Sequence, residues 1–199
     1  PPAPQSIIPA PTPALPPLPS AITLIPLINN FKQQPSLLLP LLNDVNDRTI
    51  NSTYTDMDGN QWKLPDQWIE RLNDTKEILR NLRPADILKE SECMDKCAQR
   101  IADEKAASPK IEYGVLSPKN RYCPCTLHAK YYQGYVSLPF KNPRDILVEL
   151  ALFWVPMDRK DNLLLSSDEF KYIGVGYSVN IRNGNGITAI LVAIDVKEG

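Results

Sequence analysis

The chain has 199 residues, of which 43% are hydrophobic and 23% charged, and its 22 Lys and Arg nearly balance its 23 Asp and Glu. Such a composition is typical of a globular domain, and the mixed charges give no broad basic field of the kind that binds nucleic acid. The longest apolar stretch, 147–157, is interrupted by Glu149 and is shorter than the ~20 residues that span a bilayer. We therefore expect no nucleic-acid partner and no transmembrane segment.

Proline is concentrated at the start of the chain. Nine of the 20 prolines lie in the first 19 residues, and the first charged residue is Lys32. Proline fixes φ and removes a backbone donor, so such a segment favours the extended polyproline II conformation. We predict an extended Pro-rich arm or linker over residues 1–35 and one folded domain over residues 36–199.

The apolar pattern of the folded part predicts helices first and strands last. Apolar residues recur at helical spacing in four segments, at 37–50, 66–82, 86–109 and 144–155. A short strand is expected at 130–136. The segments 171–181 and 187–196 flank an Asn-Gly-Asn-Gly turn, which predicts an antiparallel hairpin. This order indicates an α+β fold rather than alternating βαβ units.

Two small-residue patterns predict a close contact between helix and sheet. The third predicted helix carries a narrow stripe that includes Ala98 and Ala102, and the first strand of the hairpin carries Gly174 and Gly176. Glycines inside a strand often mark the close approach of another backbone. We expect this helix to lie close against a sheet.

The four cysteines form two close pairs, Cys93 with Cys97 and Cys123 with Cys125. Their even number favours two disulfides that join the third helix to the 123–125 loop. A tetrahedral zinc site is the alternative, because cysteines four apart lie on one helix face. The sequons at Asn51 and Asn73 predict N-glycosylation and, with the cysteines, a secretory route to an extracellular location.

Other motifs give little catalytic signal. His128 is the only histidine, so a Ser/His/Asp or Cys/His hydrolase would depend on it. Residues 56–60 resemble the start of a calcium loop, but Gln61 and Gln67 stand where glycine and glutamate are needed. We interpret this stretch as a polar turn.

Several stretches, in order along the chain, resemble the CAP superfamily, which comprises cysteine-rich secretory proteins, antigen 5 and plant pathogenesis-related proteins. The segment 41–48 resembles the opening helix of that family, and 82–84 with 97–103 resembles its helix with an A-x-x-x-A stripe. The segment 154–164 is similar to its Trp-to-Asn-Leu-Leu stretch, and 170–177 with 191–196 is similar to its closing strands. The resemblance implies an α-β-α sandwich with an antiparallel sheet.

The resemblance also implies a cleft in which two histidines and two acidic residues can hold a metal. Here Asp158 or Arg159 stands at the position of the later histidine, and only Glu149 and His128 could remain of the four. One imidazole and one carboxylate make a poor metal site. We therefore expect no metal, no cofactor and no catalytic residue.

The sequence thus favours a secreted, non-enzymatic, CAP-like module on a Pro-rich stalk that binds a lipid, a sterol or a protein partner. Candidate contacts are Glu149, His128, Tyr131, Tyr132 and Tyr135. Tyrosines offer apolar area with a polar tip, which suits ligand binding. The alternatives are a His128-dependent hydrolase and a structural module of an extracellular coat or cuticle.

Overall fold

The fold is given by a computed structural model of the 199-residue chain. It describes residues 21–55, 59, 61–64, 67–109, 114–115, 123–126, 132–136, 168–182, 184 and 186–197. Among these residues, no helix has both the length and the apolar character needed to cross a membrane.

Helices and strands are both present, as the sequence predicts for an α+β chain. The helices are α1 (Ala21–Gln33), η1 (Pro35–Leu37), α2 (Leu38–Asp47), α3 (Gln67–Asn81), α4 (Glu92–Ala107) and η3 (Pro124–Thr126). The strands are β1 (Thr49–Ile50), β2 (Thr53–Thr55), β3 (Gln61–Lys63), β4 (Lys89–Glu90), β5 (Gly114–Val115), β6 (Tyr132–Val136), β7 (Tyr172–Val179) and β8 (Gly186–Ala193).

A five-stranded sheet, in the order β4-β7-β8-β6-β5, forms the centre of the fold. Its longest pairing is the predicted antiparallel hairpin of β7 and β8, in register from Tyr172 opposite Ala193 to Val179 opposite Gly186. Strands β6 and β5 continue the antiparallel order, and β4 pairs parallel with β7 at the other edge. The predicted hairpin and the strand near 130–136 are therefore confirmed.

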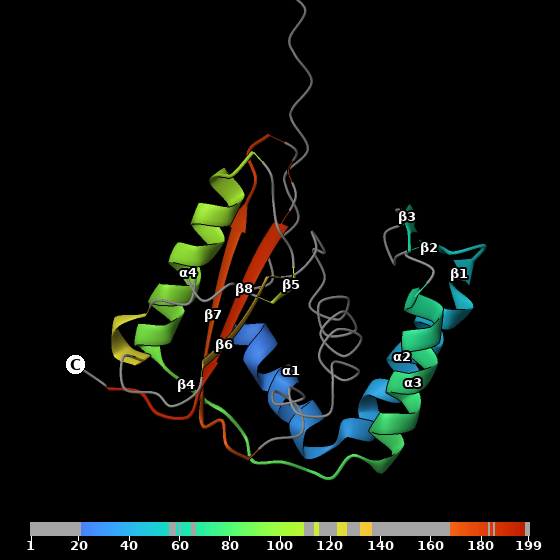
Figure 1. The fold of residues 1–199 in the computed structure, drawn as a ribbon, viewed down its shortest axis with the longest axis horizontal. Coiled ribbons are helices and arrows are strands. Elements are labelled where there is room, and N and C mark those ends of the chain that lie inside the picture. Colours follow the sequence, from blue (N-terminus) through green and yellow to red (C-terminus); the bar gives the residue numbers. More distant parts are fainter. Residues whose placement is uncertain are drawn as a thin grey trace, which may run out of the picture.

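The two faces of this sheet are covered by different helices (Figure 1). On one side, α1 packs with Ile173, Val175, Ile190 and Val192 in one buried cluster. On the other side, α4 packs with alternate residues of β8 in a second cluster. β8 is thus covered on both faces, which explains why it is buried along its whole length and why its residues, apart from Thr188, carry no polar side chain.

The close contact of α4 with the sheet depends on two glycines in β7. A Cβ atom at Gly174 would collide with the backbone of Met94, and one at Gly176 would collide with the backbone at Ala98. Ala98 is itself completely buried. The expectation that small residues on both elements allow close packing is confirmed.

The predicted extended arm is wrong for residues 21–33, which form α1. Leu24, Ile28 and Phe31 recur at helical spacing and are buried in the core, although Pro26 lies inside the helix. Pro26 removes one helical hydrogen bond, but burying three large apolar side chains favours the helix by several kcal/mol (roughly 1.5–3 kcal/mol each). Residues 1–20 of the predicted arm lie outside the described residues.

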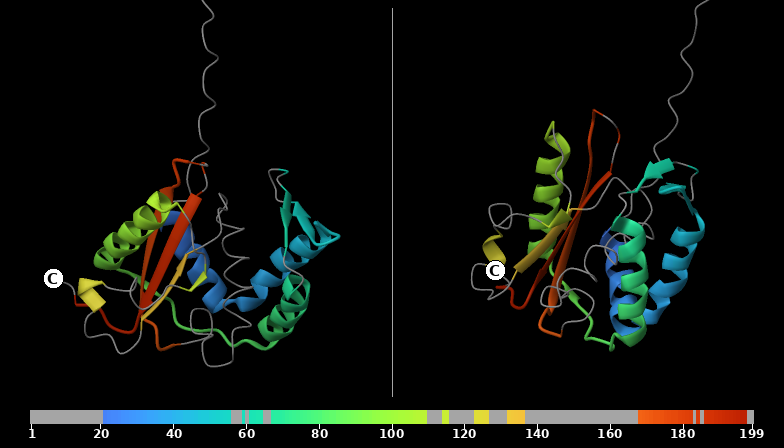
Figure 2. Two further views of the ribbon diagram at one scale, coloured as in Figure 1. Left: turned by 45° about the horizontal axis from the view of Figure 1, so that its top comes forward. Right: turned by 45° about the vertical axis from the view of Figure 1, so that its right-hand side comes forward.

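Helices α2 and α3 pack against each other and share a buried cluster with α1, which they contact through η1; the small sheet β1-β2-β3 follows α2 (Figure 2). The β1–β2 hairpin turns at Asn51 and Ser52, which both have positive φ (51° and 61°). Two such residues form the type I′ turn that two-residue hairpins prefer.

The predicted helices at 37–50 and 66–82 both exist as α2 and α3, but the first ends at Asp47. The third predicted helix, α4, begins at Glu92 and not at residue 86, because the Ser91 side chain caps it by accepting from the Met94 N–H. The predicted helix at 144–155 lies outside the described residues.

Candidate functional site

An open groove lies at the end of the central sheet where β7 begins and β8 ends. Its volume is about 800 Å³, and its lining is Gln33, Pro84, Ala85, Asp86, Ile87, Lys89, Lys171, Tyr172, Ile194 and Asp195. These residues come from the end of α1, the extended segment before β4, the start of β7 and the chain after β8. The groove therefore depends on four parts of the chain that are distant in sequence.

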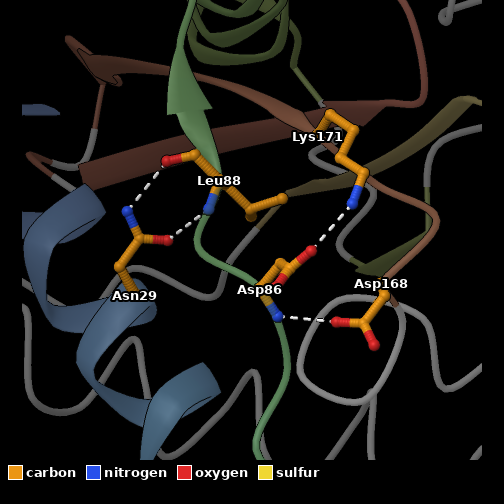
Figure 3. Close-up of polar contacts among 5 residues, drawn as sticks. All are labelled: Asn29, Asp86, Leu88, Asp168 and Lys171. Carbon is orange, nitrogen blue, oxygen red and sulfur yellow. Dashed lines mark hydrogen bonds and ion pairs between the residues drawn. The ribbon is translucent and has the colours of Figure 1, made fainter.

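One wall of the groove, residues 84–89, is held by the side chain of Asn29 on α1. The Asn29 amide donates to the Leu88 carbonyl at 2.9 Å, and its oxygen accepts from the Leu88 N–H at 2.8 Å (Figure 3). The Ala85 N–H also donates to the Lys32 carbonyl at 2.8 Å. Ala85 and Leu88 are buried, whereas Asp86 and Ile87 between them are exposed. The wall is thus fixed to α1 and presents Asp86 and Ile87 to the outside.

Asp86 connects this wall to the chain that enters β7. Its carboxylate lies 3.0 Å from the Lys171 ammonium, and its backbone N–H donates to the Asp168 carboxylate at 2.6 Å (Figure 3). The lysine and the Asp86 side chain are both largely exposed. Such an exposed pair contributes at most about 1 kcal/mol to stability. Its main effect is to orient charged groups at the rim of the groove.

Lys32 lies beneath this polar cluster and is the one fully buried charged side chain among the described residues. Burial lowers the pKa of its ammonium from 10.5 to about 8, against the opposing effects of the Asp168 and Asp86 carboxylates. The Lys171 ammonium acts in the same direction as burial. The buried Lys32 ammonium thus connects α1 electrostatically to Asp86 in the wall of the groove and to Asp168.

Side chains from α4 protect the exposed edge of β7 beyond its short pairing with β4. The Asp95 carboxylate accepts from the Val175 N–H at 2.8 Å, and the Gln99 amide bonds both the N–H and the carbonyl of Tyr177. Together with Asn29 on Leu88, these groups occupy backbone positions that a neighbouring strand would otherwise pair. Burial raises the pKa of Asp95 to about 6, with the Glu90 and Glu92 carboxylates adding to the effect and the Val175 N–H opposing it.

The four cysteines form two disulfides, Cys93 with Cys125 and Cys97 with Cys123. They join the first two turns of α4 to η3, as the sequence favours. Cys97, Cys123 and Cys125 are buried in the same cluster as Ile101 and the α4 face of β8. The disulfides thus fasten the 123–126 segment to α4 on the side of the sheet opposite α1.

Most of the predicted ligand contacts lie outside the part of the chain that the structure describes. His128, Tyr131 and Glu149 lie outside the described residues, whereas Tyr132 and Tyr135 lie on β6, in register with Ala193 and Ile190 of β8. These contacts stay predictions. Both predicted glycosylation sites lie on exposed asparagines, Asn51 at the β1–β2 turn and Asn73 on α3.

The residues that build the groove were not predicted from the sequence. Asn29 and Lys32 fall in the segment that we expected to be an extended arm, and Asp86 was expected to open a helix. The only available signal was Lys32 itself, a single charge that ends a long uncharged apolar run. Its position next to Phe31 on α1 is one that charged residues seldom occupy without partners.

No protein-family model, curated protein or solved structure matches the chain. The resemblance of the sequence to the CAP superfamily therefore stays a prediction.

Proposed function

We propose that the chain is a secreted, non-enzymatic binding module that recognises a segment of a protein partner in the groove between residues 84–89 and 194–195. The observation that carries this proposal is the lining of the groove, in which apolar groups alternate with charges of both signs. Binding sites commonly combine apolar area with a few polar groups that fix the orientation of the ligand.

The lining favours a protein partner over a sterol or another lipid. Asp86 and Lys171 are oriented toward each other at the rim, and Lys89 and Asp195 add one charge of each sign. An enclosed apolar pocket is needed to bury most of a sterol, whereas this groove is open and carries four charged groups that a sterol would remove from water. An extended peptide can satisfy them with its own charges and amides.

Ile87 is the apolar anchor of the proposed site. Its side chain belongs to the groove lining and is 50% exposed, whereas its neighbour Leu88 is buried. Asn29 and Lys32 hold the wall on either side of it through backbone hydrogen bonds. A rigid wall that presents an apolar side chain lowers the entropic cost of binding.

The non-enzymatic part of the proposal is supported by the chemistry of the lining. Among the groove residues that the structure describes, Tyr172 carries the one hydroxyl group, and none is histidine, serine or cysteine. The lining therefore does not supply the Ser/His or Cys/His pair of the hydrolases considered from the sequence. The two disulfides support the secretory part of the proposal, because disulfides persist in oxidising compartments.

The experiment is to select a displayed random-peptide library on the full chain and to measure the selected peptides by fluorescence polarisation. We expect Ile87→Glu to weaken their binding at least tenfold, which corresponds to about 1.4 kcal/mol. The matched control is Ile181→Glu, because Ile181 is 93% exposed and lies beyond the other end of β7. This control should bind as the wild type does.

Two outcomes would contradict the proposal. Peptides that bind the wild type and the Ile87→Glu protein equally would place recognition elsewhere on the chain. A fluorescent sterol that binds the wild type and loses its binding in Ile87→Glu would show that the groove takes a lipid. Circular dichroism of both variants verifies that the exposed substitutions leave the fold intact.

A further inference from the structure

The four cysteine sulfurs are gathered into a single cluster. All four Sγ atoms lie within 4.8 Å of one another. Cys123 and Cys125 belong to different disulfides, yet their Sγ atoms are only 3.2 Å apart. The two disulfides are therefore in direct contact, and the sulfurs form one compact group.

This group has the dimensions of a tetrahedral zinc site. Zn–S bonds of about 2.3 Å in tetrahedral geometry place neighbouring sulfurs about 3.8 Å apart. Once the two disulfides are opened, small movements of the four sulfurs would reach this spacing, because all four already lie within 4.8 Å of one another. Such a change is within the range of cysteine side-chain rotation about χ1.

The backbone holds the ligands in two chelating pairs. Cys93 and Cys97 are four residues apart on α4 and lie on one face of that helix. Cys123 and Cys125 flank Pro124 at η3, and the Cys125 carbonyl accepts from the Lys197 N–H at 3.0 Å. Both pairs are thus attached to elements that pack against the central sheet.

The surroundings favour thiolates and a soft metal ion. Cys93 is the second residue of α4, where the helix dipole stabilises a negative charge. The other three sulfur side chains are buried among apolar groups, and Cys93 alone of the four is partly exposed. Four thiolates select zinc over magnesium or calcium.

We propose that the four cysteines bind one Zn²⁺ when both disulfides are reduced, so that the cluster exchanges between a disulfide form and a zinc form. The site is separate from the proposed peptide groove, since none of the four cysteines lines that groove. Neither activity requires the other.

The exchange balances with ordinary thiol chemistry. A dithiol reductant of the thioredoxin class reduces each disulfide, giving up two electrons and two protons and becoming a disulfide itself. The four resulting thiols then lose four protons and form four Zn–S bonds. In the reverse direction, two molecules of a glutathione-type disulfide accept the four electrons and four solvent protons, the two protein disulfides form, and Zn²⁺ is released.

The experiment uses the full chain reduced by a water-soluble phosphine, which takes oxygen from water and leaves no competing thiol. Under anaerobic conditions Co²⁺ is added as a spectroscopic probe and then displaced with Zn²⁺. We expect one Co²⁺ per chain, with the intense visible absorption of a tetrahedral thiolate site, and loss of that absorption with one equivalent of Zn²⁺. Bound zinc should also protect the four cysteines from alkylation.

The matched control is the double variant Cys125→Thr with Thr126→Cys, which keeps four thiols but moves one along the chain. Because one ligand is displaced, its metal affinity should be at least tenfold lower. Equal affinity of the two proteins would mean non-specific binding by thiols and would overturn the proposal. Binding of less than one metal per chain, or unchanged alkylation with zinc present, would do the same.

The proposal stays testable if reduction unfolds the chain. Far-ultraviolet circular dichroism of the reduced protein should then recover its folded signal when one equivalent of Zn²⁺ is added, because metal binding contributes directly to folding. A reduced chain that remains unfolded with zinc would exclude the zinc form.

Discussion

Replacing Lys32 by methionine tests whether burying a charged ammonium beneath the groove lowers the free energy of unfolding. Lys32 is fully buried, and burial lowers its pKa from 10.5 to about 8 despite the Asp168 and Asp86 carboxylates. Between these two pH values the unfolded chain binds a proton at Lys32 and the folded chain does not. The free energy of unfolding of the wild type therefore gains a contribution as the pH rises from 8 toward 10.5.

The size of this contribution follows from the two pKa values. Integrating proton binding with a folded pKa of about 8 and an unfolded pKa of 10.5 gives a gain of about 2 kcal/mol between about pH 7.5 and pH 9.5. Lys32→Met lacks the titrating group and should lack this gain. The free energy of unfolding of the wild type minus that of the variant should therefore rise by about 2 kcal/mol over this interval.

The assay is urea unfolding of both proteins at several pH values across this interval, followed by tryptophan fluorescence and without free thiols. The control is Lys96→Met, because the Lys96 side chain is 74% exposed and its ammonium is hydrated in both states. A difference between wild type and Lys32→Met that stays constant with pH would refute the reasoning. So would an equal pH dependence of the difference for Lys96→Met.

Three further substitutions test the packing and the edge contacts. Gly176→Ala would place a Cβ against the α4 backbone, so the variant should lose about 1–3 kcal/mol of stability and its melting temperature should fall by several degrees. The control is Gly184→Ala, where the Cβ would meet open space and only the positive φ of 70° opposes the substitution. The melting temperature of this control should fall less. Burial raises the pKa of Asp95 from 3.8 to about 6, so ionisation of this carboxyl lowers the stability of the wild type as the pH rises between these values. In thermal unfolding, Asp95→Asn should therefore be more stable than the wild type at neutral pH. The difference in stability should vanish near pH 4 or below. Asn29→Ala removes both hydrogen bonds to Leu88. The variant should lose about 1–3 kcal/mol in the free energy of urea unfolding, and it should bind peptides in the groove more weakly. Unchanged stability and binding would show that Asn29 does not hold the wall.

Because residues 21–33 form a helix in the core, they cannot be removed together with the proline-rich start of the chain. A deletion of residues 1–35 would remove Leu24, Ile28 and Phe31 from the core along with Asn29. The protein would be expected to lose its groove wall and much of its stability. A test of the stalk or coat hypotheses should therefore end the deletion at residue 20.

The sequence by itself determined those features that arise between neighbouring or regularly spaced residues. The alternation of β7, the apolar run of β8 and the Asn-Gly turn between them predict the hairpin, because a strand repeats every two residues. The glycines of β7 predict a close backbone approach and the small residues of α4 predict close packing on a sheet, because only small side chains allow either; that the two elements meet each other is known from the structure. The four cysteines, in two close pairs, predict two disulfides between α4 and the 123–125 segment. The sequence does not determine their connectivity, which is Cys93–Cys125 and Cys97–Cys123 in the structure.

The tertiary structure alone decided the α1 helix and the groove. Proline content argued for an extended segment, but the core of the folded chain offered α1 a place to bury Leu24, Ile28 and Phe31, and that burial outweighs the local preference. Asn29 contacts Leu88, and Asp86 contacts Lys171, across long separations in the chain. No local pattern encodes such contacts, because they exist only after the sheet and its two covering helices have brought these residues together.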